Sequence, residues 1–273
     1  MLVGAAAAFG VFGRGGGETR AVLSVRGESY DMVTTGVYRY NSVRMVAEGV
    51  GWDMITLFGA VPALLISLPF IAKRSLRARL FAVGILAYFF YQYLMYAVAW
   101  AFGPLFLLFV VAYASSLAAI VWIVSGIEVA GLPRRVKGSF PRRGVAGFCI
   151  AIGLLLVVMW AGRIAAAHRG GPEGALLGQT THVVQAMDLG LIVPLALYTA
   201  GLTLSRRPLG FLLAPALMVK AVTMALAICA MLVLAWRAEG AFETVPFAIF
   251  ACAAGASCWL ALSSFRSIDA QRA

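Results

Sequence analysis

One ionisable side chain lies deep inside an apolar stretch of the sequence. Lys220 is near the middle of the stretch from Leu209 to Trp236, and no other charged residue falls between those ends. A lysine at the centre of a bilayer costs about 3 kcal/mol or more, and such residues usually face the bundle interior at ion, proton or substrate sites. We therefore interpret Lys220 as the first residue of an intramembrane binding site.

The apolar run before Lys220 carries two further polar candidates. Gln185 and Asp188 are three residues apart, so both lie on one face of a helix. At about 1.5 Å per residue, Asp188 lies roughly 24 Å from the basic end of its run, and Lys220 roughly 17 Å from the basic end of the next. An extended lysine covers this difference, so we expect Asp188 to pair with Lys220. The pair is either a static link between helices or part of a solute or proton site.

A stripe of polar aromatic residues occupies the run from Leu80 to Trp100. Tyr88, Gln92 and Tyr96 recur every four residues, so hydroxyl groups and an amide share one helix face. Aromatic residues alone are typical of cores and interfacial belts. With the amide among them, we predict that the stripe faces the cavity of Lys220. We expect Asp53, by contrast, at the watery outer end of its helix, as a cap or anchor.

No motif for metal binding or catalysis accompanies these residues. His168 and His182 lack metal-site spacing, and Glu128 lies too far along the chain from Lys220 to form a compact acid–base pair. The cysteines fall inside apolar runs without a CxxC pair: Cys149, Cys229, Cys252 and Cys258. We expect no metal, no cofactor and no catalytic residues. Because Asp188 and His182 are titratable, a membrane enzyme stays an alternative hypothesis, but it is the weaker one.

The elements that must position these residues are long apolar helices. The chain has 273 residues, of which 62% are hydrophobic and 12% are charged, a balance far from that of soluble proteins. Continuous apolar runs of about 20 residues predict helices that cross a bilayer, not barrel strands. Seven runs qualify: Asp53–Ala72, Leu80–Trp100, Pro104–Ile127, Val145–Ala167, His182–Leu204, Leu209–Trp236 and Thr244–Phe265. The predicted fold class is an all-α polytopic transmembrane bundle.

The net charge of +11 follows the connections between the runs. Alternate connections hold most of the basic residues: Lys73, Arg74, Arg77, Arg79, Arg134, Arg135, Lys137, Arg142, Arg143, Arg206, Arg207, Arg266 and Arg272. The opposite connections hold only Arg163, Arg169 and Arg237. The positive-inside rule then places the basic connections and the C-terminus in the cytoplasm. We expect membrane lipid as a partner and no nucleic acid.

The N-terminal region differs from the rest. We divide the chain into residues 1–52, a short apolar segment followed by an external stretch, and residues 53–273, the helical bundle. The run from Leu2 to Gly13 gives a helix of about 18 Å, which is shorter than the roughly 30 Å hydrocarbon core. Either this run inserts with help from the bundle, or it is the remnant of a helix clipped by a late start. We favour the second explanation.

A weak internal repeat organises the runs. When Pro62 is aligned with Pro194, Arg74 falls on Arg206 without a gap. Both units then read as a helix with a central proline, a basic turn and a second helix, which predicts a 3+1+3 arrangement. Parallel repeats of this kind place transporter sites between the halves. Prolines and loop arginines are also common in unrelated bundles.

Three strings carry a resemblance: AEGVGWDMITLFGAVPALL, AYFFYQYLMYAVAWAFGPLFLLF and TTHVVQAMDLGLIVPLALYTAG. They resemble an uncharacterised bacterial family of multi-pass integral membrane proteins, over roughly Gly36 to Phe265. The resemblance implies a protein of the bacterial cytoplasmic (inner) membrane with an additional N-terminal helix. It supplies no functional residues.

These observations favour a transporter or small-solute-binding membrane protein. Its predicted site consists of Lys220, Asp188, Gln185, Tyr88, Gln92 and Tyr96. The alternative is a non-catalytic scaffold or accessory subunit of the membrane, in which the Asp188–Lys220 pair is purely structural. A third class, a photoreceptor with a covalently bound chromophore on the lysine, fits seven helices only superficially.

Overall fold

Long apolar helices make up most of the computed structural model, which describes residues 1–170 and 174–269. Seven helical segments of this described part are long and apolar enough to cross a membrane. They are Val43–Ala72, Leu76–Ala99, Phe106–Ser125, Arg142–His168, Val183–Leu204, Pro208–Glu239 and Thr244–Ser267. The predicted all-α bundle is confirmed, and the chain has the architecture of a multi-pass membrane protein.

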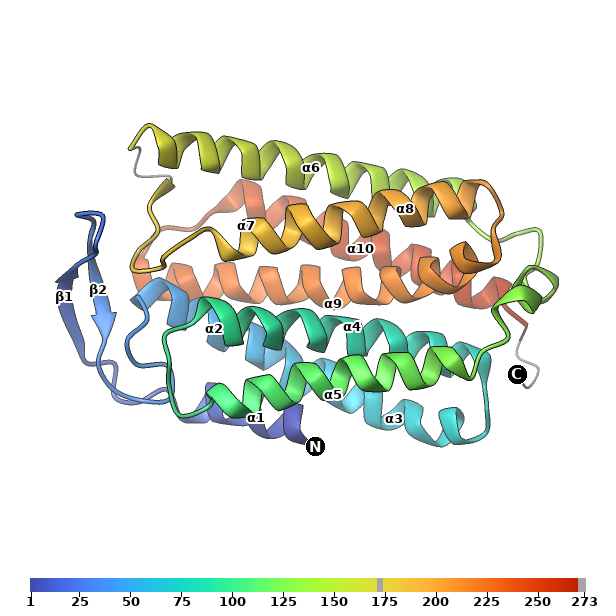
Figure 1. Cartoon of the computed structure of the whole chain (residues 1–273), viewed down its shortest axis with the longest axis horizontal. Helices are drawn as coiled ribbons and strands as arrows, with labels where there is room; N and C mark the ends of the chain where they lie inside the picture. Colours follow the sequence, from blue (N-terminus) through green and yellow to red (C-terminus); the bar gives the residue numbers. More distant parts are fainter. Residues whose placement is uncertain (171–173, 270–273) are drawn as a thin grey trace.

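The elements fall into two groups that lie on opposite sides of the bundle (Figure 1). The first contains α1 (Leu2–Phe12), β1 (Thr19–Leu23), β2 (Ser29–Val33), α2 (Val43–Ile55), η1 (Thr56–Ala60), α3 (Val61–Ala72), α4 (Leu76–Ala99) and α5 (Phe106–Ser125). The second contains α6 (Arg142–His168), α7 (Val183–Met187), η4 (Asp188–Ile192), α8 (Val193–Leu204), α9 (Pro208–Glu239) and α10 (Thr244–Ser267). The short helix η2 (Val129–Arg135) leads from the first group to the second.

The first spanning helix begins ten residues before the predicted start at Asp53. Ser42 caps it, because its hydroxyl accepts a hydrogen bond of 3.3 Å from the backbone N–H of Met45. Arg44 and Glu48 then pair across one turn of the helix, at 2.9 Å. These charged residues lower the hydropathy of the first turns, so the apolar run in the sequence begins later than the helix does. Consequently Asp53 lies about 15 Å inside the helix and not at its outer end.

The helix α1 lies along the first group and does not cross the bundle by itself. It contacts α2, η1 and α5, with Ala6, Ala7 and Gly10 buried, and Tyr93 donates a hydrogen bond of 3.0 Å to the carbonyl of Val3. Eleven residues span about 16 Å, roughly half of a hydrocarbon core. In the second group, α6 takes the corresponding place against η4, α8 and α10.

Strands β1 and β2 form an antiparallel hairpin in which Thr19 pairs with Val33. The hairpin extends beyond the helices at one end of the molecule (Figure 1). The carboxylate of Glu28 accepts hydrogen bonds of 3.0 to 3.1 Å from the backbone N–H groups of Leu176 and Leu177. These bonds fasten the hairpin over the connection between α6 and α7.

The two groups match in local backbone geometry. Each contains a π-helical turn, η1 or η4, with a proline, Pro62 or Pro194, two residues after its end. Proline has no N–H to donate, which is why the regular helical hydrogen bonding changes there. The helices α4 and α9 cross at Gly84, where a Cβ atom would lie 2.5 Å from the carbonyl of Ala216. Ala216 is the residue that the repeat aligns with Gly84.

More than half of the basic residues lie at one end of the bundle, which we call the basic end. The end of α10 and the connections α3–α4, α5–α6 and α8–α9 all lie there, opposite the hairpin end (Figure 1). The guanidinium of Arg77 donates two hydrogen bonds, of 2.8 and 2.5 Å, to the carbonyl of Ile268. Arg272 lies outside the described residues. The charge asymmetry predicted from the sequence therefore corresponds to two distinct ends.

Candidate functional site

The predicted site residues separate into two groups in the structure. Lys220 and Asp188 line a cavity between α6, α9 and α10, which we call the inner cavity. Gln185 lines a second cavity nearer the hairpin end, which we call the vestibule. Tyr88, Gln92 and Tyr96 instead surround Asp53 in a hydrogen-bonded network. The six residues therefore do not share one cavity: of the stripe, Tyr96 lines the vestibule, whereas Tyr88 and Gln92 line neither the vestibule nor the inner cavity.

The inner cavity has a volume of about 330 Å³. This volume is within the range of roughly 300–1,000 Å³ that small-molecule sites occupy. Its walls are mainly apolar side chains, including Phe148, Leu156, Met224, Ile228, Leu232 and Phe250. A cavity of this kind suits an apolar molecule or the apolar part of a larger one.

Asp188 is held at the cavity wall by two donors. It is the first residue of η4, and Tyr91 of α4 donates a hydrogen bond of 2.6 Å to its Oδ1 atom. Trp160 of α6 donates a hydrogen bond of 2.8 Å to its Oδ2 atom. Each carboxylate oxygen therefore already accepts one hydrogen bond. The carboxylate joins three elements that are distant in the sequence.

Lys220 does not form the direct ion pair that its depth predicts. The ion pairs between described residues do not include Asp188 with Lys220. Both residues contact Tyr91 instead: the Lys220 Nζ atom lies over its ring, 4.5 Å from the centroid, and the Tyr91 hydroxyl donates to Asp188. Although only 6% of the lysine is exposed, its ammonium has no hydrogen-bond acceptor among the described residues. It also lines a further apolar cavity of about 210 Å³ on the other side of Tyr91.

The vestibule has a volume of about 230 Å³ and lies below the connection between α6 and α7. Gln185 is 6% exposed, and its side-chain amide has no hydrogen-bond partner in the described part of the chain. The same is true of the His182 Nε2 atom. Burial lowers the pKa of the His182 imidazole below its ordinary value of 6.5, and the guanidinium groups of Arg163 and Arg26 lower it further. His182 is therefore neutral at pH 7.

The vestibule and the inner cavity share a wall. Five residues line both: Trp52, Trp160, Arg163, Val184 and Met231. Trp52 stacks on Tyr91, with ring centroids 6.2 Å apart and an angle of 23° between the rings. It is 4% exposed, and its indole N–H has no partner within the described residues. A buried N–H without an acceptor is uncommon, because most buried polar groups are hydrogen-bonded.

Asp53 is the main residue that the sequence interpretation misplaced. It is 0% exposed, so the expectation of a water-exposed cap or anchor is wrong. Gln92 donates a hydrogen bond of 3.1 Å and Tyr96 one of 3.4 Å to its Oδ1 atom, and Tyr38 donates to its Oδ2 atom. Burial raises the pKa of the Tyr38 phenol well above its ordinary value, and the Asp53 carboxylate raises it further. Tyr38 therefore remains a donor.

The network continues from Asp53 through Gln92 to Thr56 and Tyr88. The Thr56 hydroxyl donates a hydrogen bond of 2.6 Å to Gln92 Oε1 and lies 2.8 Å from the Tyr88 hydroxyl. The repeat itself contained the signal for this site. Its offset aligns Asp53 with Gln185 and Thr56 with Asp188, so both units carry polar residues at the same two positions. Trp160 and Tyr91 carried no comparable signal, because aromatic residues are common in apolar helices.

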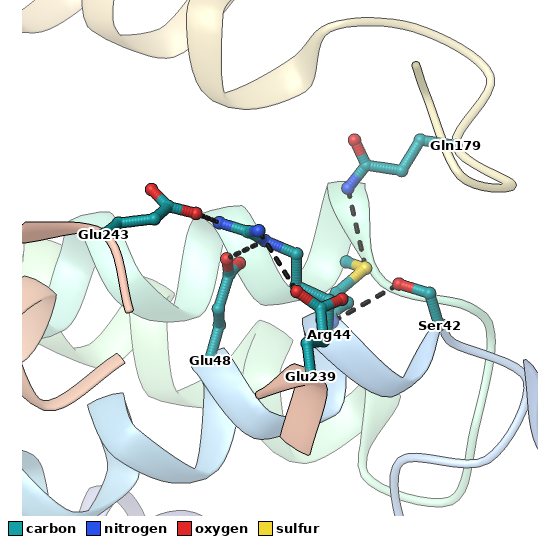
Figure 2. Close-up of polar contacts among 7 residues, drawn as sticks. Ser42, Arg44, Glu48, Gln179, Glu239 and Glu243 are labelled. Carbon is teal, nitrogen blue, oxygen red and sulfur yellow. Dashed lines mark hydrogen bonds and ion pairs between the residues drawn. The ribbon is translucent and has the colours of Figure 1, made fainter. Parts of the chain in front are cut away.

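A cluster of charged residues lies at the hairpin end (Figure 2). Arg44 contacts the carboxylates of Glu48 at 2.9 Å, of Glu239 at 3.2 Å and of Glu243. The cluster joins α2 to the end of α9 and to the residue before α10. Glu48 lines the vestibule and Glu243 lines the inner cavity, so the cluster borders both.

Known proteins do not identify the chain. No family model, no curated protein and no solved structure matches it. Among the described residues, no three histidine, cysteine, aspartate or glutamate side chains are grouped to hold a metal ion. The feature that remains for function is a largely apolar cavity lined by two polar residues. The Asp188 carboxylate already accepts hydrogen bonds, whereas the Lys220 ammonium has no acceptor among the described residues.

Proposed function

We propose that the chain is a transporter or small-solute-binding protein whose site is the inner cavity. The observation that carries this proposal is the Lys220 ammonium, which faces a cavity of about 330 Å³ without a hydrogen-bond acceptor. An ammonium has three donors, and a buried one without an acceptor is costly. A bound solute that supplies an acceptor would remove this cost.

The vestibule supports a route for the solute from the hairpin end. It adjoins the inner cavity at Trp52, Trp160 and Arg163. Polar side chains follow the route, because Gln185 and His182 line the vestibule. Such groups can exchange hydrogen bonds with a passing solute or with water.

Helix irregularities beside the site support movement as well as binding. The π-helical turn η4 begins at Asp188 and is followed by Pro194, and the turn η1 with Pro62 repeats this arrangement. Single π-helical turns are frequent at functional sites, and interrupted helices carry the sites of many transporters. Rocking of one unit against the other would expose the cavity to the basic end.

We propose the bacterial cytoplasmic membrane as the location, with the basic end and the C-terminus in the cytoplasm. The positive-inside rule favours this orientation, and the family resemblance favours the bacterial membrane. An alkaline phosphatase fused to the C-terminus should be inactive in cells, whereas a fluorescent protein there should fold. An active phosphatase would reverse the orientation.

A cysteine in the cavity tests the proposed site. With all four native cysteines replaced by alanine, Ala221→Cys places a thiol beside Lys220, and Leu226→Cys places one on an exposed face of the same helix. We expect a membrane-impermeant methanethiosulfonate to modify Ala221→Cys from the hairpin end of intact cells, and not Leu226→Cys. Equal resistance of both thiols would contradict a solute-accessible cavity and favour the scaffold alternative.

Cys149 distinguishes transport from binding alone. It lines the inner cavity about 10 Å from the start of α6 at the basic end. With the other three cysteines replaced, a transporter should expose Cys149 to the same reagent in inverted vesicles. A binding protein that never opens toward the basic end should leave it unmodified.

A further inference from the structure

We infer that the solute is an amphipathic organic anion, whose carboxylate or phosphate contacts Lys220 and whose apolar body lies along α9 between α6 and α10. This inference rests on the proposed function, because it names the class of molecule for the same site. Two observations support it: hydrogen-bond donors at the inner cavity are unused within the described part of the chain, and the cavity walls are mainly apolar.

The polar groups without partners at the inner cavity are donors. The Lys220 ammonium has no hydrogen-bond acceptor among the described residues. Arg163 lines both cavities at their shared wall and adds a second cation. A ligand that satisfies these groups must supply acceptors, and an anion also supplies the opposite charge.

The carboxylates that line the cavity already accept hydrogen bonds. Both oxygens of Asp188 accept hydrogen bonds, from Tyr91 and Trp160. Glu243, the other carboxylate that lines the cavity, accepts from Arg44. A cationic solute would therefore compete with existing donors for Asp188 and Glu243, while it left Lys220 unsatisfied. The balance of partners favours an anion over an amine.

The cavity walls indicate the rest of the molecule. Apolar residues of α9 line the cavity from Leu217 to Leu232, a distance of about 22 Å along the helix. Phe148 and Leu156 of α6 and Phe250 of α10 face the same space. A solute rich in hydroxyl groups, such as a sugar, would lose hydrogen bonds with water here and gain few in return. An aliphatic or aromatic body would gain free energy from burial.

A matched set of probes separates head-group charge from apolar body. We would titrate para-butylbenzoate, para-butylbenzyl alcohol and para-butylbenzylamine into the full chain in lipid nanodiscs by isothermal calorimetry. Empty nanodiscs measure partition of each probe into lipid. We expect the benzoate to bind at least about tenfold more tightly than the alcohol, because only the benzoate forms a charged hydrogen bond with Lys220. The amine should show no saturable binding.

Variants of Lys220 test the assigned contact. Lys220→Met should weaken benzoate binding by about 10- to 100-fold, because it removes the charged donor. Lys220→Arg should retain most of the affinity, which shows that a folded site with a cation suffices. Asp188→Asn should tighten benzoate binding severalfold, because it removes a nearby negative charge. Thermal unfolding of each variant checks that the bundle is intact.

Three outcomes would overturn the inference. Equal binding of all three probes with no effect of Lys220→Met would leave a solute cavity but no anion site. Binding of the amine that Asp188→Asn abolishes would assign a cation instead. If no probe binds while the Ala221→Cys thiol is modified, the cavity is accessible but the ligand class is wrong. Resistance of that thiol as well would overturn the proposed function itself.

Discussion

The two repeat units, one in each group of elements, carry polar residues at matching positions, but these residues have different surroundings. In the first unit, Asp53 accepts hydrogen bonds from Tyr38, Gln92 and Tyr96 and is fully buried. In the second, Asp188 lines a cavity with Lys220, whose ammonium has no acceptor among the described residues. We call these the closed and the open site.

The neighbouring helices account for the difference. In the closed site, α1 passes so near that a Cβ atom at Gly10 would overlap both Asp53 Oδ2 and the Tyr38 hydroxyl. In the open site, α6 contacts Asp188 through the indole N–H of Trp160, and the inner cavity lies beside it. A network with every partner in place stabilises a structure, whereas unused donors beside a cavity indicate binding.

We expect the largest change in stability when the Asp53 carboxylate of the closed site is removed. Asp53→Ala should lower the free energy of unfolding by about 3 kcal/mol or more, because the buried donors of Tyr38 and Gln92 lose their acceptor. Asp188→Ala should cost only about 1–2 kcal/mol, because water in the cavity can accept from Tyr91 and Trp160. Unfolding in mixed micelles of increasing denaturing detergent measures both. Equal losses would remove the distinction between the sites.

A methyl group at Gly10 should have the next largest effect. Gly10→Ala has to displace α1 from Asp53 and Tyr38, and overpacking of this kind costs about 1–3 kcal/mol. Gly4→Ala on the same helix is the matched control, because its Cβ would meet Val61 at an ordinary 3.6 Å. Thermal unfolding in nanodiscs compares the two variants. If Gly10→Ala is as stable as Gly4→Ala, then α1 does not close the first site.

Two tryptophans at the shared wall should respond differently to the same change. Trp160→Phe removes the donor to Asp188, with an expected loss of about 1–2 kcal/mol. Trp52→Phe removes an indole N–H that has no partner in the described structure, so it should lose only the packing of the larger buried ring and less stability than Trp160→Phe. The same unfolding measurement applies. A large loss for Trp52→Phe alone would show that its N–H is satisfied after all.

The smallest effect concerns pH at the vestibule. Because the pKa of folded His182 lies below its ordinary 6.5, the unfolded chain binds the proton more readily as pH falls. Stability from this group is therefore present above about pH 6.5 and is lost below it. The partial exposure of His182 limits the change in Tm to about 1 °C. In His182→Gln, the fall in Tm between about pH 7 and pH 5 should be smaller than in the wild-type chain by this amount.

Much of the architecture was predictable from local sequence. Apolar runs of about 20 residues located the seven spanning helices, and the loop arginines separated the two ends. The first helix was the exception, since Arg44 and Glu48 interrupt its outer part. Charged residues that pair across a helix turn lower hydropathy without ending the helix.

The site was predictable only in part, for a geometric reason. Spacing on one helix correctly associated Tyr88 with Gln92, because residues four apart share a face. It could not orient that face relative to another helix, and so it assigned the stripe to Lys220 when it belongs to Asp53. Depth along a helix likewise brought Asp188 and Lys220 to similar levels but could not show that each of them contacts Tyr91 and that they form no direct ion pair.

The amino-acid sequence by itself determined that the chain forms apolar helices, how long they are, which end is basic and that Lys220 is buried in one of them. These properties depend on composition and on contacts within a helix turn. Only the tertiary structure decided that Asp53 is enclosed while Lys220 faces a cavity. That outcome depends on how closely α1 packs against Asp53 and α6 against Asp188, and hence on whether the neighbouring helix leaves room for a ligand.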